Sequence, residues 1–463
     1  MSAQPPAMPD QTSPPRLGPL PRFRPIDALS LCWWLAPLAV IIWWTINSLR
    51  QIGSTNSLNE RFRDFFVFFD GASALVANTP LHLAGQGDLR YIYPPLLAVL
   101  LMPLVPMGVT AAAYVWLAIK SICMLISITV SALAITGRLP GCLASTSPRT
   151  RTALWIAAGV IAAIGTIILA DKIRSEYRMQ QSNVLLLLGW AIALWWIDRR
   201  PVWAGAALGF VVCIKYTAII ALPYLLLRRR WWAAGAMSIA IAIGLTAPSL
   251  IIGWDRTIGG LSSSLGGVGN IIAGNQQAAQ DAKVLSMTSI GNSIPTGVLT
   301  LTGRTGLDGL TAAIIALLAA GTFAAAWLIY RWRAVAMFAG RGDTAHAAEP
   351  TVRSTVALEW VGLIIASLAF SPQTNSPHLV QLVPFSIAIA AAAMWATSHA
   401  RRWLAIAAAL VLLAGLTLPP SYDEASRLLA YKFHRAGWPG ACLIISYLLL
   451  LASALSGQRA SAQ

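Results

Sequence analysis

Long apolar stretches, separated by short polar ones, occupy most of the chain. A helix needs about 20 apolar residues to cross a hydrocarbon core about 30 Å thick, and on that scale twelve apolar segments stand out. They run over residues 28–48, 91–107, 108–136, 153–170, 184–197, 202–227, 232–252, 307–330, 354–370, 377–397, 403–418 and 437–456. This pattern predicts an all-α polytopic membrane protein with about 10 to 12 transmembrane segments.

Two of these segments are interrupted. Segment 91–107 is short and contains four prolines, and segment 202–227 carries Lys215 in its middle. If both dip into the membrane without crossing and the N-terminus is inside, the cytoplasmic pieces hold 18 Lys and Arg in 85 residues, against 13 in 132 for the external pieces. That asymmetry agrees with the positive-inside rule. Because broken helices at membrane depth are tolerated only beside protein or a wet cavity, the two dips also indicate a substrate chamber.

The polar stretches define the organisation of the chain. Residues 1–27 are rich in proline and predict a disordered cytoplasmic tail. Residues 28–456 are expected to form a single transmembrane domain, and residues 457–463 a short cytoplasmic tail. Loops 49–90 and 253–306 are long and lie on the external side of this layout. Loops of such length are usually functional or disordered.

Composition excludes several classes of protein. Of the 463 residues, 57% are hydrophobic and 11% are charged, whereas about a quarter of the residues of a soluble protein are charged. We therefore assign the net charge of +16 to cytoplasmic loops and contacts with lipid headgroups, and expect no nucleic-acid partner. The five cysteines form no close pair, and His, Cys and carboxylate residues show no ligand spacing. Neither a disulfide framework nor an obligatory metal is expected.

The first external loop predicts an amphipathic helix lying on the membrane surface. Its apolar residues recur at helical spacing at Phe65, Phe68, Phe69, Ala72, Leu75 and Val76. Asp64 stands at the start of this helix and has two compatible interpretations. It is either the N-cap, which the spacing alone slightly favours, or a general base flanked by the phosphate-binding cations Arg61 and Arg63. Asp70 lies off the apolar stripe and is expected in solvent.

Polar residues further along the chain are candidates for a site. Lys215 is costly in mid-membrane and is a functional candidate by default, with snorkelling to a headgroup as the alternative. Lys120 and Glu359 raise the same question and are candidates for a structural pair with each other. Gln181 and Asn183 offer amides to sugar hydroxyls or are ordinary loop residues. His378 binds a substrate or is a polar helix end after a proline.

The order of these motifs resembles glycosyltransferase family 87, a family of polyprenyl-phosphate-sugar-dependent enzymes with the GT-C fold. The resemblance spans roughly residues 60 to 385 and is specific as an ordered set. Its motifs are Asp64-Phe65, Tyr93 to Leu96, Gln181 with Asn183, Ala204-Gly205 through Lys215, Arg228 to Trp231, and Ser371-Pro372 with His378. Two positions depart from the family pattern: Gln180 replaces a glycine, and Asn375-Ser376-Pro377 stands where an aromatic residue next to the histidine is usual.

The resemblance implies a reaction and a site. The reaction is inverting transfer of a sugar, most often mannose and sometimes arabinofuranose, from a polyprenyl-phosphate carrier to a lipid or glycan hydroxyl. It would take place on the external face of the cytoplasmic membrane, with no cofactor beyond the lipid-linked donor. Asp64 would be the base, since an alcohol attacks poorly unless a carboxylate takes its proton. The implied substrate-binding residues are Arg61, Arg63, Tyr93, Arg178, Gln181, Asn183, Lys215 and His378, with Lys172 and Arg174 as further cations for the departing phosphate.

Two other classes share the apolar segments. A secondary transporter or lipid flippase would account for the intramembrane charges, but the repeated halves with paired broken helices that mark many transporters are missing. A polymerase or ligase of lipid-linked glycans would depend on Arg and His residues of a late external loop. The location of the indispensable carboxylate separates these classes from a glycosyltransferase that uses Asp64.

Overall fold

The computed structural model describes residues 25–52, 62–86, 89–139, 148–273, 291–338, 350–372, 374–417 and 432–455. The α-helices are α1 (Pro25–Ile52), α3 (Arg63–Val76), α4 (Pro95–Leu101), α5 (Gly108–Thr136), α6 (Pro148–Ile168), α7 (Ala170–Met179), α8 (Asn183–Trp196), α9 (Pro201–Val212), α10 (Ala221–Leu227), α11 (Trp231–Thr246), α12 (Ser249–Ile252), α13 (Trp254–Ala273), α16 (Ile294–Thr302), α17 (Gly309–Trp332), α18 (Pro350–Ala369), α19 (Val383–Trp395), α20 (His399–Leu416) and α22 (Trp438–Ala454). Between them lie the 3-10 helices η1 (Leu81–Leu83), η2 (Met102–Met107), η3 (Tyr216–Ile220) and η5 (Ser376–Leu382), and the two-residue antiparallel strands β1 (Gly85–Gln86) and β2 (Leu89–Arg90).

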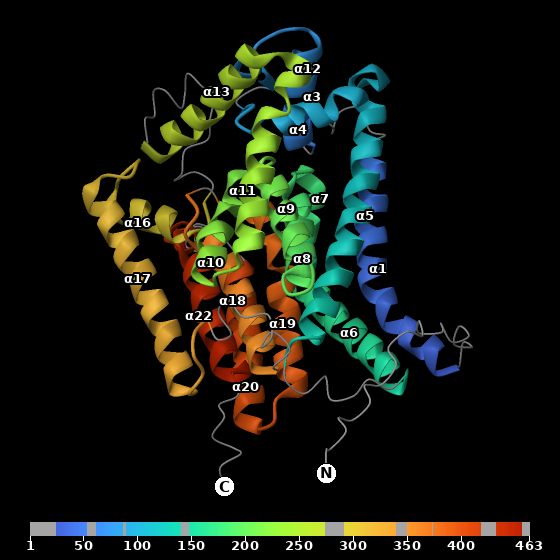
Figure 1. Cartoon of the computed structure of the whole chain (residues 1–463), viewed down its shortest axis with the longest axis vertical. Coiled ribbons are helices and arrows are strands. Elements are labelled where there is room, and N and C mark those ends of the chain that lie inside the picture. The colour runs from blue at the N-terminus through green and yellow to red at the C-terminus, as the bar shows by residue number, and fades with distance from the viewer. Residues whose placement is uncertain are drawn as a thin grey trace, which may run out of the picture.

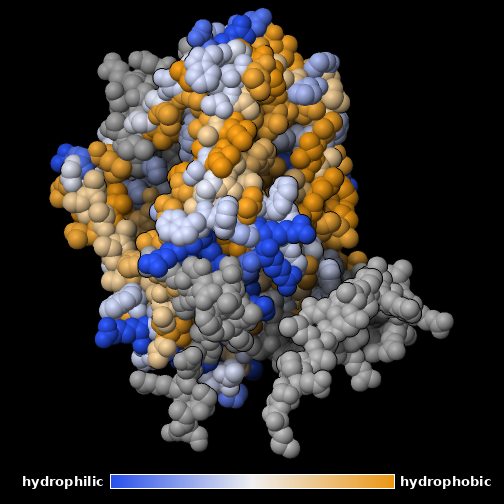
Figure 2. Space-filling model, in the orientation of Figure 1, coloured by the Kyte–Doolittle hydropathy of each residue, from blue (hydrophilic) through white to orange (hydrophobic). Residues whose placement is uncertain are grey.

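The helices form a bundle along the long axis, with α3, α4, α12 and α13 gathered at one end (Figure 1). Apolar side chains cover much of the outer surface of the bundle, as Figure 2 shows for one face. In the described part of the chain, seven helical stretches are long and apolar enough to cross a membrane, or eight if the bent pair α6–α7 forms one span. Four shorter apolar helical stretches accompany them. The all-α multi-pass membrane fold is therefore confirmed, while 10 to 12 spans stays a prediction.

Both interrupted segments are broken in the structure. The first divides into α4 and η2, which lead directly into α5. The second divides into α9, η3 and α10, and Lys215 lies at the break with extended backbone. Whether either segment crosses the membrane stays a prediction, as do the two tails, because residues 1–24 and 456–463 lie outside the described residues.

The two long loops contain more structure than their composition indicates. The segment 253–306, expected as a Gly-rich and Ser-rich loop, forms helices α13 and α16. Small residues allow α13 to lie against the turn before α4, since an added Cβ at Gly260 would come within 2.9 Å of Pro95 and one at Gly267 within 3.1 Å of Ile92. The predicted helix after the first span is also present as α3. However, most of its apolar stripe packs against α4, η2 and β1 of the protein.

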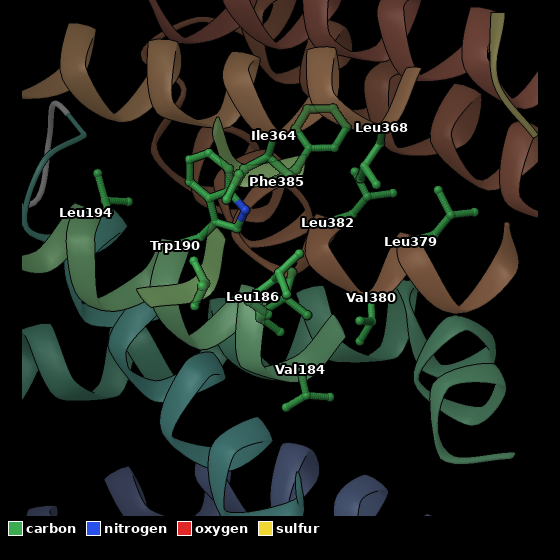
Figure 3. Packing of buried hydrophobic residues seen from close by; sticks show 14 of the residues in the cluster. Val184, Leu186, Trp190, Leu194, Ile364, Leu368, Leu379, Val380, Leu382 and Phe385 are labelled. Carbon is green, nitrogen blue, oxygen red and sulfur yellow. The ribbon is translucent and has the colours of Figure 1, made fainter. Parts of the chain in front are cut away.

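The core lies where α8 meets α18, η5 and α19. Figure 3 shows Trp190 of α8 and Phe385 of α19 within this apolar cluster. The rings of Trp190 and Trp360 are 5.5 Å apart at 82°, and the Trp360 indole donates a 3.1 Å hydrogen bond to the Trp190 carbonyl. Since lipid tails are as apolar as these side chains, close packing and hydrogen bonds provide much of the association between such helices.

Ion pairs with little exposure to solvent also join the helices. Glu359 accepts from Arg228 at 2.7 Å and from the Tyr224 hydroxyl at 3.0 Å, which links α18 to the end of α10. Asp198, after α8, pairs with Arg138 and Arg230. Lys120 pairs with Glu176 at 2.9 Å. The expected pairing of Lys120 with Glu359 is therefore wrong, because each has a nearer partner of opposite charge.

The helices differ widely in how closely they pack. The helices α9 and α11 approach so closely that a Cβ at Gly205 would lie 2.0 Å from the Ala233 carbonyl oxygen. By contrast α17, at the edge of the bundle in Figure 1, packs mainly against α16 and α22. Only 6% of its most apolar stretch is buried in the protein.

The close contact of α9 and α11 predicts that alanine substitutions at two glycines of these helices will have different effects on stability. We expect Gly205→Ala to destabilise the protein by roughly 1 to 3 kcal/mol, because the Ala233 backbone cannot yield without separating the helices. Gly235 on α11 has no heavy atom within 4 Å of its added Cβ, so Gly235→Ala should keep or raise stability. Thermal unfolding of both purified variants in one detergent measures the difference. Equal midpoints would show that the two helices do not meet this closely.

Candidate active site

Asp64 lies on the buried side of α3, and one of its carboxylate oxygens accepts no hydrogen bond. The N-cap position belongs to Phe62, and Asp64 is the second residue of the helix. The N-cap interpretation of Asp64 is therefore wrong. The side chain is 9% exposed, and its Oδ2 is buried with no hydrogen-bond partner. Aromatic residues surround the start of the helix, where Phe65 stacks on Trp116 with ring centroids 6.2 Å apart.

Burial and nearby cations act in opposite directions on this carboxyl. Burial raises the pKa of Asp64 above its ordinary value of 3.8, although a hydrogen bond from Gln181 and the positive charges of Lys215, Arg63 and Lys120 lower it. Removal from water disfavours the charged form, and here it outweighs the cations. Since a carboxylate with a raised pKa is a stronger base, this environment favours proton transfer to Asp64.

The turn from α7 to α8 carries the polar residues next to Asp64. Asn183 donates from Nδ2 to Gln181 at 2.6 Å and to Glu176 at 3.0 Å. Glu176 also pairs with Lys120 of α5, so the turn is anchored on a second helix. Gln180 ends α7 in the left-handed conformation, with φ of 57°. Glycine adopts that conformation without strain, and this accounts for the glycine of the family pattern at the same position.

Lys215 connects the α7–α8 turn to η5. Its Nζ donates to Asn183 Oδ1 at 3.0 Å and lies 2.5 Å from His378 Nε2. It also lies 5.9 Å from the centre of the Tyr93 ring, and Phe68 packs against that ring with centroids 4.9 Å apart. The ammonium group therefore contacts protein groups from α8, η5 and the turn before α4. Snorkelling to a lipid headgroup does not describe this position.

The structure brings together some of the residues expected at the site. Gln181, Asn183 and Lys215 form one connected cluster with Asp64, together with Tyr93 and His378. Arg63 is half-buried and close enough to influence Asp64.

Of the other expected residues, those that the structure describes lie outside this cluster. Lys172, expected as a cation for the departing phosphate, is buried on α7 and pairs with Asp171 at 3.1 Å. Arg178 is exposed on the last turn of α7, and Arg174 is exposed beside Trp44. Asp70 is half-buried instead of lying fully in solvent. Arg61 lies outside the described residues.

Two members of the cluster were missed from the sequence. Glu176 is fully buried as the partner of Lys120, and the signal was present, since a lysine in an apolar segment requires a counter-charge. Ser182 is buried beside Asn183, and its Oγ has no hydrogen-bond partner. Among the residues that the structure describes, no group of three or more His, Cys, Asp or Glu could hold a metal ion.

Comparison with known proteins gives three similar curated relatives. A polyprenol-phosphate-mannose-dependent alpha-(1-2)-phosphatidylinositol mannoside mannosyltransferase of Mycolicibacterium smegmatis is 25% identical over 373 residues, covering 77% of this chain and 75% of the relative. The protein of the same description from Mycobacterium tuberculosis is 29% identical over 201 residues, which cover 41% of this chain and 45% of the relative. A pentamannoside mannosyltransferase of M. smegmatis is 28% identical, with 52% and 53% of the two chains covered.

The family model of glycosyltransferase family 87 matches residues 91–348. No solved structure matches the chain significantly. The matched region contains Tyr93, Gln181, Asn183 and Lys215 of the cluster, while Asp64 precedes it and His378 follows it. Because the match covers more than half of the 463 residues, the chain belongs to glycosyltransferase family 87.

Proposed function

We propose that the protein is an inverting mannosyltransferase, which moves mannose from a polyprenyl-phosphate carrier to a hydroxyl group of a glycolipid. The names of the three relatives support this donor and a phosphatidylinositol mannoside as the acceptor class. The observation that carries the proposal is the unpartnered Oδ2 of Asp64 within a buried cluster that contains Lys215. A base and a cation at one place are what this transfer requires.

Each residue of the cluster has a role in the proposed reaction. The acceptor oxygen attacks the sugar carbon that carries the phosphate, and its proton passes to Asp64 Oδ2. The bond between that carbon and the phosphate oxygen breaks, and its electron pair leaves with the polyprenyl phosphate. The Lys215 ammonium group stabilises the charge on this phosphate, and Asn183 and His378 hold Lys215 in place. Gln181 positions the Asp64 carboxylate.

The proposed site faces the external side of the cytoplasmic membrane. The distribution of arginines along the helices of the cluster supports this orientation. Asn183 begins α8 whereas Asp198, with its arginine partners, follows the end of that helix. Along α5, Lys120 lies in the first half and Arg138 follows the last turn. The arginine-rich ends thus lie away from the candidate site along both helices.

Cysteine labelling of intact cells tests this orientation. In a cysteine-free background, Ser262→Cys on the exposed face of α13 should react with a membrane-impermeant maleimide. Ala400→Cys at the exposed start of α20 should react only after the cells are opened. The reverse pattern would place the site on the cytoplasmic side.

Replacing the base tests the mechanism directly. We expect Asp64→Asn to lower the turnover of mannose transfer about 100- to 10,000-fold, since an amide cannot accept the acceptor's proton. Transfer of labelled mannose from polyprenyl-phosphate mannose to phosphatidylinositol mannoside measures this. Asp70→Asn is the matched control on the same helix and should retain turnover. Near-normal turnover of Asp64→Asn, at a thermal midpoint equal to that of the wild type, would exclude Asp64 as the base.

The raised pKa of Asp64 gives the reaction a characteristic pH dependence. As the pH falls through this pKa, Asp64 takes up a proton and stops acting as a base, so kcat/KM should fall at a pH above the ordinary 3.8. Because the charge of Arg63 lowers this pKa, Arg63→Gln should move the acid limb to higher pH. Arg178→Gln on the exposed end of α7 should leave it in place. Identical pH profiles for Arg63→Gln and Arg178→Gln would contradict the assignment.

A further inference from the structure

A second polar cluster lies beside the candidate active site. It is formed by Lys172 of α7, Ser376 at the start of η5, Asn292 before α16 and His434 before α22. Lys172 Nζ donates to Ser376 Oγ at 3.3 Å, and His434 Nδ1 lies 2.9 Å from Asn292 Oδ1. The Asn292 backbone N–H also donates to the Thr374 carbonyl at 2.6 Å, close to Ser376 in the chain. Four segments that are distant in sequence thus meet at one place.

His434 presents an unused acceptor in this cluster. Since an amide oxygen only accepts, the hydrogen of the neutral ring lies on Nδ1, and Nε2 carries a lone pair. That Nε2 is buried and has no hydrogen-bond partner. Burial and the charge of Lys172 lower the pKa of His434 from 6.5 to about 4. The ring is therefore neutral at physiological pH, and Nε2 remains an acceptor.

Close backbone packing fixes the position of His434. A Cβ at Gly297 would lie 2.6 Å from the Ala436 carbonyl oxygen, and one at Gly440 would lie 2.8 Å from the Ile294 amide nitrogen. Gly437, which follows Ala436 in the chain, has φ of 84°, a conformation that favours glycine. The segment before α22 can therefore lie directly on the start of α16. This contact holds the imidazole against Asn292.

The chemistry of the cluster favours a hydroxyl group over a phosphate. The Lys172 ammonium group, which also pairs with the Asp171 carboxylate at 3.1 Å, only donates, whereas His434 Nε2 accepts. A hydroxyl group both donates and accepts and so satisfies the two groups, while a phosphate oxygen would face the lone pair of Nε2. Sugars carry several such hydroxyls on neighbouring carbons. The cluster is thus suited to a carbohydrate.

The location of the cluster decides which sugar it would hold. Lys172 and Glu176 are four residues apart on α7, about 6 Å along the helix axis, and Glu176 belongs to the Asp64 cluster through Asn183. Ser376 and His378 likewise lie on one turn of η5. A donor with a single mannose has its only sugar at the reacting centre. A glycolipid acceptor carries further sugars, which extend from that centre.

We infer that Lys172, Ser376, Asn292 and His434 form an acceptor subsite that binds a second sugar of the glycan next to the one being extended. The inference rests on the proposed function and deepens it. It assigns a role in acceptor selection to His434, which lies beyond the region that matches the family model.

The subsite is tested with a pair of acceptors and two variants. The probes are octyl mannoside and octyl dimannoside, with labelled polyprenyl-phosphate mannose as donor. In the wild type, the dimannoside should have the lower KM. His434→Asn retains an N–H for Asn292 and removes the Nε2 acceptor, and Lys172→Gln removes the ammonium group. Each variant should raise the KM of the dimannoside about 3- to 10-fold, which is the range for the loss of one or two hydrogen bonds. The KM of the monomannoside, the KM of the donor and kcat should stay within about twofold of the wild-type values.

Controls distinguish failure of the subsite from failure of the function. His399→Asn, at an exposed histidine on α20, should behave as the wild type. Absence of transfer by the wild type to phosphatidylinositol mannoside as well as to both probes would reject the proposed function itself. With the wild type active, an unchanged preference for the dimannoside in both variants would overturn the subsite. A rise in the donor KM, or a fall in kcat alone, would also overturn it. If His434→Asn does not fold, the same KM values are measured for Lys172→Gln and Ser376→Ala.

Discussion

A lysine that is surrounded by apolar helices needs a counter-charge, and in this protein that requirement positions the candidate active site. Both Lys120 and Glu176 are fully buried, and their ion pair ties α5 to α7. Removing either partner would leave an uncompensated charge in a medium of low dielectric constant. Glu176 then accepts from Asn183, and Asn183 accepts from Lys215. The Lys120–Glu176 ion pair is thereby connected through the Asn183 amide to Lys215, the cation of the candidate active site.

Carboxylates with more than one partner also occur at the arginine-rich ends of the helices. Asp198 serves both Arg138 and Arg230, and Glu359 serves Arg228 and the Tyr224 hydroxyl. Each carboxylate is shared because few acids are available among 33 Lys and Arg. The buried acids at the arginine-rich ends fix the helices, whereas Asp64 keeps an unpartnered oxygen, as expected of a group that meets a substrate.

Periodicity and hydropathy were enough to predict the membrane fold, the helix after the first span and the breaks in two apolar segments, because these features depend on local sequence. The ordered motifs were enough to indicate the family. Pairings such as Lys120 with Glu176 could not be read from the sequence, since they depend on which helices become neighbours. Nor could His434 be found, since its partner Asn292 is 142 residues away. The burial of Asp64 was missed for the same reason, as Gln181 of the α7–α8 turn comes beside it only in the folded chain.

The sparse packing of α17 has a consequence for handling the protein. With 6% of its apolar stretch buried in the protein, this helix exposes nearly all of that stretch to its surroundings, which in a membrane are the acyl chains of lipids. Solubilisation exchanges those chains for detergent tails, and the exchange falls more heavily on α17 than on α18, of which 78% is buried. Loss of bound lipid during purification would thus first loosen one side of the bundle. A preparation in nanodiscs would keep that side in its native solvent.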